Sequence, residues 1–257
     1  MTILDKIIED KRQEVTGLKQ SSPQSVLEEM IEQRMPVRGF AGALATPGIS
    51  LIAEAKKASP SRGLLCPDFD AVRLARTYEE SGAAAISVLT ESKYFQGRLD
   101  YLTAVKGAVD IPVLRKDFIF DPYQVYESAA AGADAILLIV AVLTDGQLDE
   151  LQSLANDLGL ACLVEVHDES EVERAVGAGV RIIGINNRDL VTFDVDITTT
   201  GRLRPLIPEG PITVSESGIR TRDDMTLLQG YGVDAILVGE SLVTSENIPQ
   251  TIKELLS

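Results

Sequence analysis

Residues 131–136 read AGADAI, and the chain repeats this pattern in three other places. Residues 81–86 read SGAAAI, residues 232–236 read GVDAI, and residues 179–183 follow the pattern more loosely as GVRII. Each copy predicts a helix that ends at a glycine able to adopt a positive φ, followed at once by an apolar strand. The recurring unit of the fold is therefore a helix joined to a strand.

Around these repeats, eight apolar runs have the composition of buried strands, and helical patterns fill the gaps between them. The predicted strands cover residues 51–56, 84–89, 111–116, 134–140, 160–166, 181–186, 211–216 and 234–239, and predicted helices cover residues 71–80, 122–131, 145–158, 169–178 and 222–229. Near-continuous apolar strands separated by helices indicate a parallel sheet covered by helices. Eight such units predict an α/β fold, a (β/α)8 TIM barrel. The alternative is a doubly wound open sheet, which usually has fewer strands, and no GxGxxG motif follows the first strand.

The first 45 residues differ from the rest. Apolar residues at helical spacing predict two short amphipathic helices, which separate at residues 21–23, and residues 39–48 read as a linker. We therefore expect an N-terminal helical extension over residues 1–45 and a barrel over residues 46–257. A chain of 257 residues suits one large domain, so the two parts are expected to form one domain together.

Composition excludes several classes of protein. With 45 % hydrophobic and 25 % charged residues, the chain is typical of a globular protein. Its longest apolar run, residues 135–143, is far shorter than the about 20 residues of a membrane span. The first residues, MTILDKIIEDKRQEV, lack the basic start and apolar core of a signal peptide, so we expect a cytoplasmic protein.

The net charge and the small number of histidines and cysteines argue against several binding partners and mechanisms. A formal net charge of −15 repels nucleic acid and anionic membranes, so neither is expected as a partner. The chain has one histidine, His167, and two cysteines, Cys66 and Cys162, in unrelated contexts. This argues against a zinc site of the His/Cys type and against any Ser-His-Asp mechanism that does not use His167.

Polar side chains end five of the predicted strands, where a TIM barrel carries its chemistry. Because side chains alternate along a strand, these residues can all point into one mouth. They are Glu54, Lys56, Lys116, Glu165, Asn186 and Glu216. A single polar residue at a strand end is commonly just solvated. A ring of buried charges from five strands is costly in free energy, so it indicates a functional site. A lysine among carboxylates stays protonated and can donate a proton, whereas a carboxylate near lysines stays ionised and can accept one.

Two loops predict a phosphate site. Residues 217–219, Ser-Gly-Ile, follow the seventh strand, and Thr221 with Asp224 resembles a capping box at the start of the next helix. Gly239 and Glu240 follow the eighth strand, and Ser241 is placed to cap a short helix there. Loops after strands 7 and 8 of TIM barrels recurrently bind phosphate through backbone N–H groups. The alternative is that Gly218 and Gly239 are only turn glycines.

Several blocks resemble one family, the indole-3-glycerol phosphate synthases of tryptophan biosynthesis. The blocks are LIAEAKKASPSRG at residues 51–63, SVLTE at 87–91, YFQG at 94–97, LRKDF at 114–118, VEV at 164–166, IGINNRDL at 183–190, SESGI at 215–219 and LVG at 237–239. The resemblance implies a TIM barrel with an N-terminal helical extension. It also implies closure of the indole ring of a carboxyphenylamino-deoxyribulose phosphate, with release of carbon dioxide and water and without metal or organic cofactor.

The resemblance also implies roles for individual residues. Lys116 matches the general acid, Glu165 the general base, Lys56 a lysine near the substrate carboxylate, Glu54 and Asn186 a supporting polar pair, and Glu216 a further carboxylate. The expected contacts to the aromatic ring are Phe95, Phe118 and Leu137, and Arg188 is expected beside the site. The expected phosphate-side residues are Ser59, Ser217, Gly218, Gly239 and Glu240.

Other functions stay open at this point. Phosphoribosylanthranilate isomerase uses a cysteine at the end of the first strand, where this chain has Glu-Ala-Lys and Cys66 lies further on. A flavin oxidoreductase with the same phosphate loops is a second alternative, but the charged mouth fits it poorly. A non-catalytic barrel subunit is a third, but it does not explain why the chain matches the full set of catalytic residues. We expect a phosphorylated small-molecule substrate and a monomer or weak oligomer; association with other tryptophan-pathway enzymes is a further hypothesis.

Overall fold

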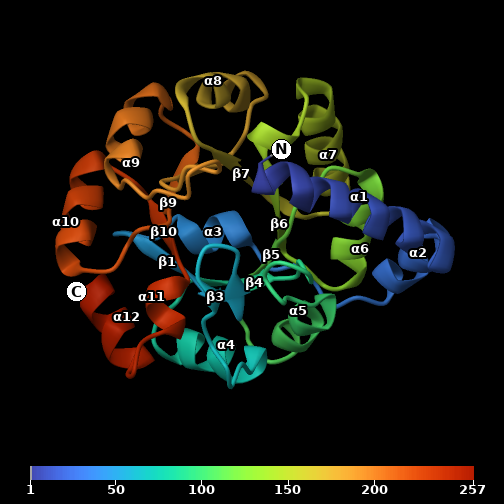
Figure 1. The fold of residues 1–257 in the computed structure, drawn as a ribbon, viewed down its shortest axis with the longest axis horizontal. Coiled ribbons are helices and arrows are strands. Elements are labelled where there is room, and N and C mark those ends of the chain that lie inside the picture. The colour runs from blue at the N-terminus through green and yellow to red at the C-terminus, as the bar shows by residue number, and fades with distance from the viewer. Residues whose placement is uncertain (1) are drawn as a thin grey trace.

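Eight parallel strands close into a barrel in the computed structural model, which describes residues 2–257 (Figure 1). The strands are β1 (Ser50–Ala55), β4 (Ala85–Leu89), β5 (Val113–Lys116), β6 (Ala135–Ile139), β7 (Ala161–Val166), β8 (Ile182–Asn186), β9 (Ile212–Glu216) and β10 (Ala235–Val238). The ring closes because β1 pairs with both β4 and β10, with Ile52 opposite Ala85 and Leu237. This confirms the predicted (β/α)8 barrel and all eight predicted strands.

Helices surround the barrel, and each predicted helix is present. The barrel helices are α4 (Ala71–Glu80), α5 (Leu99–Lys106), α6 (Pro122–Ala130), α7 (Asp145–Asp157), α8 (Glu169–Gly177), α9 (Thr198–Leu203), α10 (Arg222–Tyr231), α11 (Glu240–Val243) and α12 (Ile248–Leu256), with 3-10 turns η1 (Val140–Val142) and η2 (Arg204–Leu206). Side-chain caps begin several of them; Thr221 and Asp224 form the predicted capping box at α10. The four glycines of the repeated pattern all have positive φ, between 66° and 99°.

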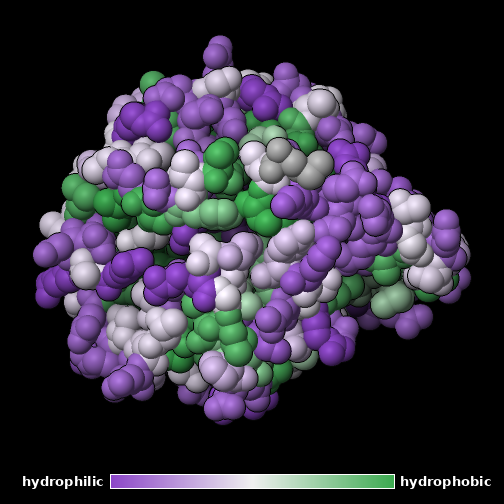
Figure 2. Space-filling view, in the orientation of Figure 1, coloured by the Kyte–Doolittle hydropathy of each residue, from purple (hydrophilic) through white to green (hydrophobic). Residues whose placement is uncertain are grey.

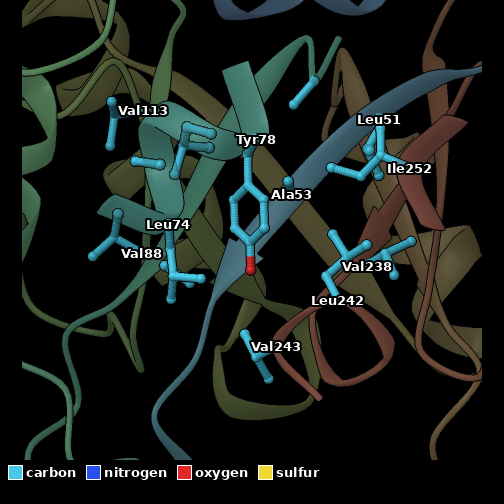
Figure 3. Packing of buried hydrophobic residues seen from close by; sticks show 14 of the residues in the cluster. Leu51, Ala53, Leu74, Tyr78, Val88, Val113, Val238, Leu242, Val243 and Ile252 are labelled. Carbon is cyan, nitrogen blue, oxygen red and sulfur yellow. The ribbon is translucent and has the colours of Figure 1, made fainter. Parts of the chain in front are cut away.

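Apolar residues fill two regions, the barrel interior and the layer between strands and helices. Inside, Ile52, Leu114, Leu163 and Val214 pack together, and each lies two residues before a polar residue that points the same way. Outside, Tyr78 of α4 lies fully buried among residues of β1, β4, β10 and α11 (Figure 3). The inward direction of the polar strand ends thus follows from the alternation of side chains along each strand.

The N-terminal segment forms three helices. Two of them, α1 (Ile3–Ser21) and α2 (Gln24–Glu32), break at residues 22–23 as predicted. The predicted linker over residues 39–48 is wrong over its first half, because residues Phe40–Leu44 form α3. Phe40 and Leu44 are buried against barrel residues such as Ala85 and Ala135, at the ends where the strands begin. Figure 1 shows α3 within the ring of helices, so this segment plugs the barrel rather than merely connecting two parts.

We expect the substitution Phe40→Ala to destabilise the fold without touching the mouth. Phe40 is 1 % exposed, and removing a buried phenylalanine leaves a cavity that typically costs about 3–5 kcal/mol. Urea unfolding followed by circular dichroism measures the change. The control Met35→Ala, at a side chain that is 42 % exposed, should change stability by less than about 0.5 kcal/mol. Equal stability of the two variants would show that α3 is not a plug.

A short hairpin between β1 and α4 was not predicted from the sequence. It consists of β2 (Ala58–Ser59) and β3 (Gly63–Leu64), which pair antiparallel. Two-residue strands are too short to show alternation, so their pattern cannot be read from the sequence. The hairpin holds Ser59 in a buried position at the mouth of the barrel.

Candidate active site

A pocket opens at the carboxyl ends of the barrel strands, and every residue predicted for the site lines it. Strand residues Glu54, Lys116, Leu137, Glu165, Asn186 and Glu216 contribute their side chains from β1, β5, β6, β7, β8 and β9. The loops and the hairpin contribute Lys56, Ser59, Phe95, Phe118, Arg188, Ser217, Gly218 and Gly239, and α11 contributes Glu240. Figure 2 shows hydrophilic side chains over most of the rim of the face in view, with hydrophobic side chains in a band above its centre and in a second group below it.

Lys116 holds the centre of the pocket between two carboxylates. Its Nζ lies 2.7 Å from Glu165 Oε2 and 2.7 Å from Glu216 Oε2. All three side chains are largely buried, with exposed fractions of 13 %, 3 % and 2 %. Burial lowers the pKa of Lys116, but the two carboxylates outweigh it and hold that pKa above its usual range. Lys116 therefore remains a protonated donor at neutral pH, as expected.

The two carboxylates differ in their protonation. Burial raises the pKa of Glu165, but Lys116 and His167 together outweigh this and hold the pKa well below its usual value. Burial also raises the pKa of Glu216, the negative charge of Glu165 adds to the effect, and the pKa reaches about 7. The expectation that carboxylates near lysine stay ionised therefore holds for Glu165 and not fully for Glu216. The reason is that one ammonium group cannot compensate two buried carboxylates equally.

Two glycines provide the room that these carboxylates occupy. A Cβ added at Gly184 of β8 would collide with Glu216 Oε1, and one added at Gly239 would collide with Glu54 Oε1. Gly239 has a φ of −125°, so it is not a turn glycine that needs a positive φ. Its lack of a side chain instead lets Glu54 pair with Lys56 at 2.5 Å.

The two loops expected on the phosphate side turn tightly. Ser217 and Gly218 both have positive φ, 69° and 84°. A Cβ at Gly218 would also meet Val195 Cγ1 at 2.5 Å, so this position needs glycine for two reasons. The predicted cap at Ser241 is wrong, because α11 has no side-chain cap; the Ser241 hydroxyl instead donates to the carbonyl of Ile219 at 2.9 Å and joins the two loops.

Arginine side chains gather beside the same loops. Arg188 lies 3.8 Å and Arg62 3.4 Å from the Glu240 carboxylate, and Arg220 reaches it at 4.0 Å. Asn186 accepts the backbone N–H of Arg188 at 3.1 Å, which fixes the start of that loop. A strongly acidic chain thus places two arginines, Arg188 and Arg220, in the lining of its pocket, and a third, Arg62, against the lining residue Glu240.

Apolar side chains form the opposite wall. Phe95 and Phe118 have ring centroids 6.2 Å apart, and Leu137 lies with them along the pocket. The N-terminal helix α1 adds Ile3, Leu4 and Ile7, which the sequence analysis did not assign to the site. The pocket therefore has an apolar side, a charged floor and a side with arginine residues.

Comparison with known proteins shows the family of the chain. A family model described as indole-3-glycerol phosphate synthase matches residues 4–255. The chain belongs to the indole-3-glycerol phosphate synthase family.

Curated relatives named indole-3-glycerol phosphate synthase agree over nearly their whole length. One from Dehalococcoides mccartyi (strain ATCC BAA-2266) is 51 % identical over 259 residues, covering 99 % of this chain and 100 % of the relative. One from Chlorobium phaeobacteroides is 51 % identical over 254 residues, covering 98 % of each. One from Roseiflexus castenholzii is 49 % identical over 263 residues, covering 99 % of this chain and 98 % of the relative. The match with this synthase family decides against the isomerase alternative.

Solved structures of lower identity agree in fold alone. KGPDC from Streptococcus mutans aligns with a TM-score of 0.65 at 13 % identity, covering 80 % of this chain and 95 % of that chain. Thiamine phosphate pyrophosphorylase from Pyrococcus furiosus aligns with a TM-score of 0.62 at 17 % identity, covering 84 % and 96 %.

Within residues 2–257 of this synthase-family chain, no helix is both long and apolar enough to cross a membrane. The same described residues contain no group of three or more His, Cys, Asp or Glu side chains arranged to hold a metal ion.

One buried ion pair and one exposed ion pair attach α1 to the synthase barrel. Lys11 is 3.2 Å from Asp117, the residue after Lys116, and both side chains are almost fully buried. Asp10 accepts hydrogen bonds from Lys93 at 2.7 Å and from the Tyr94 hydroxyl at 2.5 Å. These contacts hold the apolar face of α1 over the pocket. No local sequence signal finds them, because each joins residues far apart in the chain.

Proposed function

We propose that the chain closes the indole ring of 1-(2-carboxyphenylamino)-1-deoxyribulose 5-phosphate, releasing carbon dioxide and water to give indole-3-glycerol phosphate. The observation that carries the assignment of roles is Lys116, paired at 2.7 Å with both Glu165 and Glu216 between an apolar wall and the arginine-rich loops. Aromatic ring, reacting carbons and phosphate can then lie along the pocket in that order.

The chemistry needs an acid in two steps and a base in one. The ring carbon that bears the carboxylate attacks the ketone, and the ketone oxygen takes a proton from a lysine. Loss of carbon dioxide then restores the aromatic amine. Departure of the hydroxyl as water takes a second proton from a lysine, and Glu165 removes the ring proton, which completes the indole.

The proton balance favours Lys116 and Glu165 as partners. In the dehydration the acid loses one proton and the base gains one. Because Lys116 Nζ lies 2.7 Å from Glu165 Oε2, one direct transfer between them restores both groups. Lys56 is the second lysine of the mouth, paired with Glu54 near the expected position of the substrate carboxylate. Single-turnover traces of Lys56→Ala and Lys116→Ala distinguish which lysine serves each acid step.

The remaining roles follow the family positions. Glu54 and Asn186 support the polar groups, and Glu216 shares Lys116 with the base. Phe95, Phe118 and Leu137 hold the aromatic ring. Ser59, Ser217, Gly218, Gly239 and Glu240 are the phosphate-side residues, and Arg188 lies beside the site, where it adds positive charge for the anionic substrate.

Incubation of the purified protein with the carboxyphenylamino substrate tests the function. Indole fluorescence should rise in step with the release of carbon dioxide. Absence of both, from a protein shown to be folded by circular dichroism, would overturn the proposal.

If the loop at Ser217 binds the substrate phosphate, the substitution Ser217→Asp should strongly weaken substrate binding. An aspartate there sets a negative charge beside the phosphate, so KM should rise at least tenfold while kcat changes less. Inorganic phosphate should compete with substrate for the wild type, and added salt should raise KM because it screens the arginines. Ser153→Asp, at an exposed position of α7, is the matched control and should leave KM unchanged. A normal KM for Ser217→Asp, together with no competition by phosphate, would place the phosphate elsewhere.

We also propose that residues 1–45 and 46–257 form one domain, that it works in the cytoplasm, and that it is a monomer or weak oligomer able to associate with other tryptophan-pathway enzymes. The buried pair of Lys11 and Asp117 supports the single domain. Size-exclusion chromatography with light scattering tests the oligomeric state.

A further inference from the structure

His167, the one histidine of the chain, follows β7 directly and lies against the carboxylate of Glu165. Its Nε2 is 3.2 Å from Glu165 Oε1, whereas Lys116 Nζ is 2.7 Å from Oε2. The two oxygens of Glu165 thus face two different nitrogen groups. The Nε2 contact lacks the alignment of a hydrogen bond, and this buried nitrogen has no other hydrogen-bond partner among the described residues.

The opposite nitrogen of the ring is held by Glu171 on α8. Glu171 Oε2 lies 2.9 Å from His167 Nδ1, and the same oxygen accepts the backbone N–H of His167 at 2.8 Å. The His167 side chain is 12 % exposed and that of Glu171 is 13 % exposed, so water screens neither group fully. The start of α8, where Asp168 is the N-cap, fixes Glu171 and therefore the plane of the ring.

Three carboxylates act on this imidazole, and Lys116 lies beyond one of them. Burial lowers the pKa of His167, but its contacts with Glu165 and Glu171 outweigh burial and raise the pKa to about 10. Asp189, in the loop after β8, has a pKa lowered mainly by the backbone N–H groups of Thr192 and Val191, with a smaller contribution from His167. The ring is therefore an imidazolium at neutral pH.

We propose that His167 is a positioning residue for Glu165, in which the imidazolium, oriented by Glu171, holds the Oε1 side of the carboxylate and directs Oε2 toward the substrate. This inference rests on the proposed function, because that function makes Glu165 the base. The base accepts the ring proton at Oε2 and returns it to Lys116, while His167 keeps its own proton throughout. A second positive charge also keeps Glu165 ionised while Lys116 is without its proton.

Nuclear magnetic resonance of the wild-type protein tests the charged state directly. Because the chain has one histidine, every imidazole signal of a histidine-labelled sample belongs to His167. The ring should titrate near pH 10, and Glu171→Gln should lower its pKa by at least one unit. The matched control is Glu169→Gln on the same helix, which pairs with Arg202 at the surface and should leave the titration unchanged. A wild-type ring that titrates near the ordinary value of about 6.5 would overturn the proposal.

Two substitutions separate positioning from packing. In His167→Asn the amide can still reach Glu171 but not Glu165, whereas in His167→Gln it can reach Glu165. We expect Asn to lower kcat about tenfold with KM within twofold, and Gln to recover much of that loss. Both variants remove the charge that lowers the pKa of Glu165. The acid limb of kcat should therefore move to higher pH by about one unit or more.

The activities of the wild type and of the two variants separate a positioning role of His167 from the ring-closing function. If the wild type turns over and both variants keep its kcat and its acid limb, His167 has no positioning role. If the two variants lose stability equally and keep equal kcat, the histidine only packs, and the inference is likewise wrong. A folded wild type without turnover overturns the proposed function, and the positioning role with it.

Discussion

Replacing Lys116 with alanine should reduce kcat by about 10²–10⁴-fold, the usual loss for a general acid. The substitution removes the ammonium that lies 2.7 Å from both Glu165 and Glu216. The chain should still fold, because the two buried carboxylates can take up protons when their shared cation is lost. Stopped-flow indole fluorescence measures the rate, and circular dichroism checks the fold.

Two further variants show which property of Lys116 matters. Lys116→Arg keeps a positive charge between the carboxylates but holds its proton at all accessible pH values, so it should be nearly as slow as alanine. Lys253→Ala, at an exposed position of α12, should retain full activity. Near-normal turnover of the arginine variant would mean that Lys116 acts through its charge alone, and near-normal turnover of the alanine variant would remove it from the mechanism.

In the variant Glu165→Gln, carbon dioxide should be released well before the indole product forms. Glutamine keeps the shape of the side chain but cannot accept the ring proton, so the last step should slow by about 10²–10⁴-fold. Ring closure and decarboxylation precede that step, and substrate binding should change little. A single turnover should therefore release carbon dioxide rapidly while indole fluorescence lags far behind.

The matched control for this experiment lies on the neighbouring helix. Glu173→Gln changes an exposed carboxylate of α8 and should keep the two signals synchronous. If carbon dioxide and fluorescence also stay synchronous and fast in Glu165→Gln, another group is the base.

The barrel could be predicted because its strands are buried on both faces. Such strands have continuous apolar runs, and the eight runs correspond to eight strands of the ring. The segment Phe40–Leu44 was missed because a five-residue helix flanked by small residues carries no periodic pattern long enough to detect. Its burial depends on the barrel end that it covers, which is a property of the assembled fold.

The site was predictable to the extent that it depends on strand alternation. Counting in steps of two places Glu54, Lys116, Glu165 and Glu216 in one mouth, and the structure brings them there. The sequence could not show that Gly184 makes room for Glu216, or that burial beside Glu165 raises the pKa of Glu216 to about 7. These effects depend on distances between strands, which residue spacing along one strand does not contain.

The attachment of α1 through Lys11 has a consequence for how the protein is made. Lys11 and Asp117 are separated by 106 positions, and ribosomes add about 5–20 residues per second. The first helix therefore waits roughly 5–20 s during translation before its buried partner has even been added. Throughout that interval Ile7 and Val15 have no barrel to cover them, so the nascent chain offers an amphipathic segment to chaperones. Slow codons between these two positions would lengthen this exposure and should lower the yield of folded enzyme without altering a single amino acid.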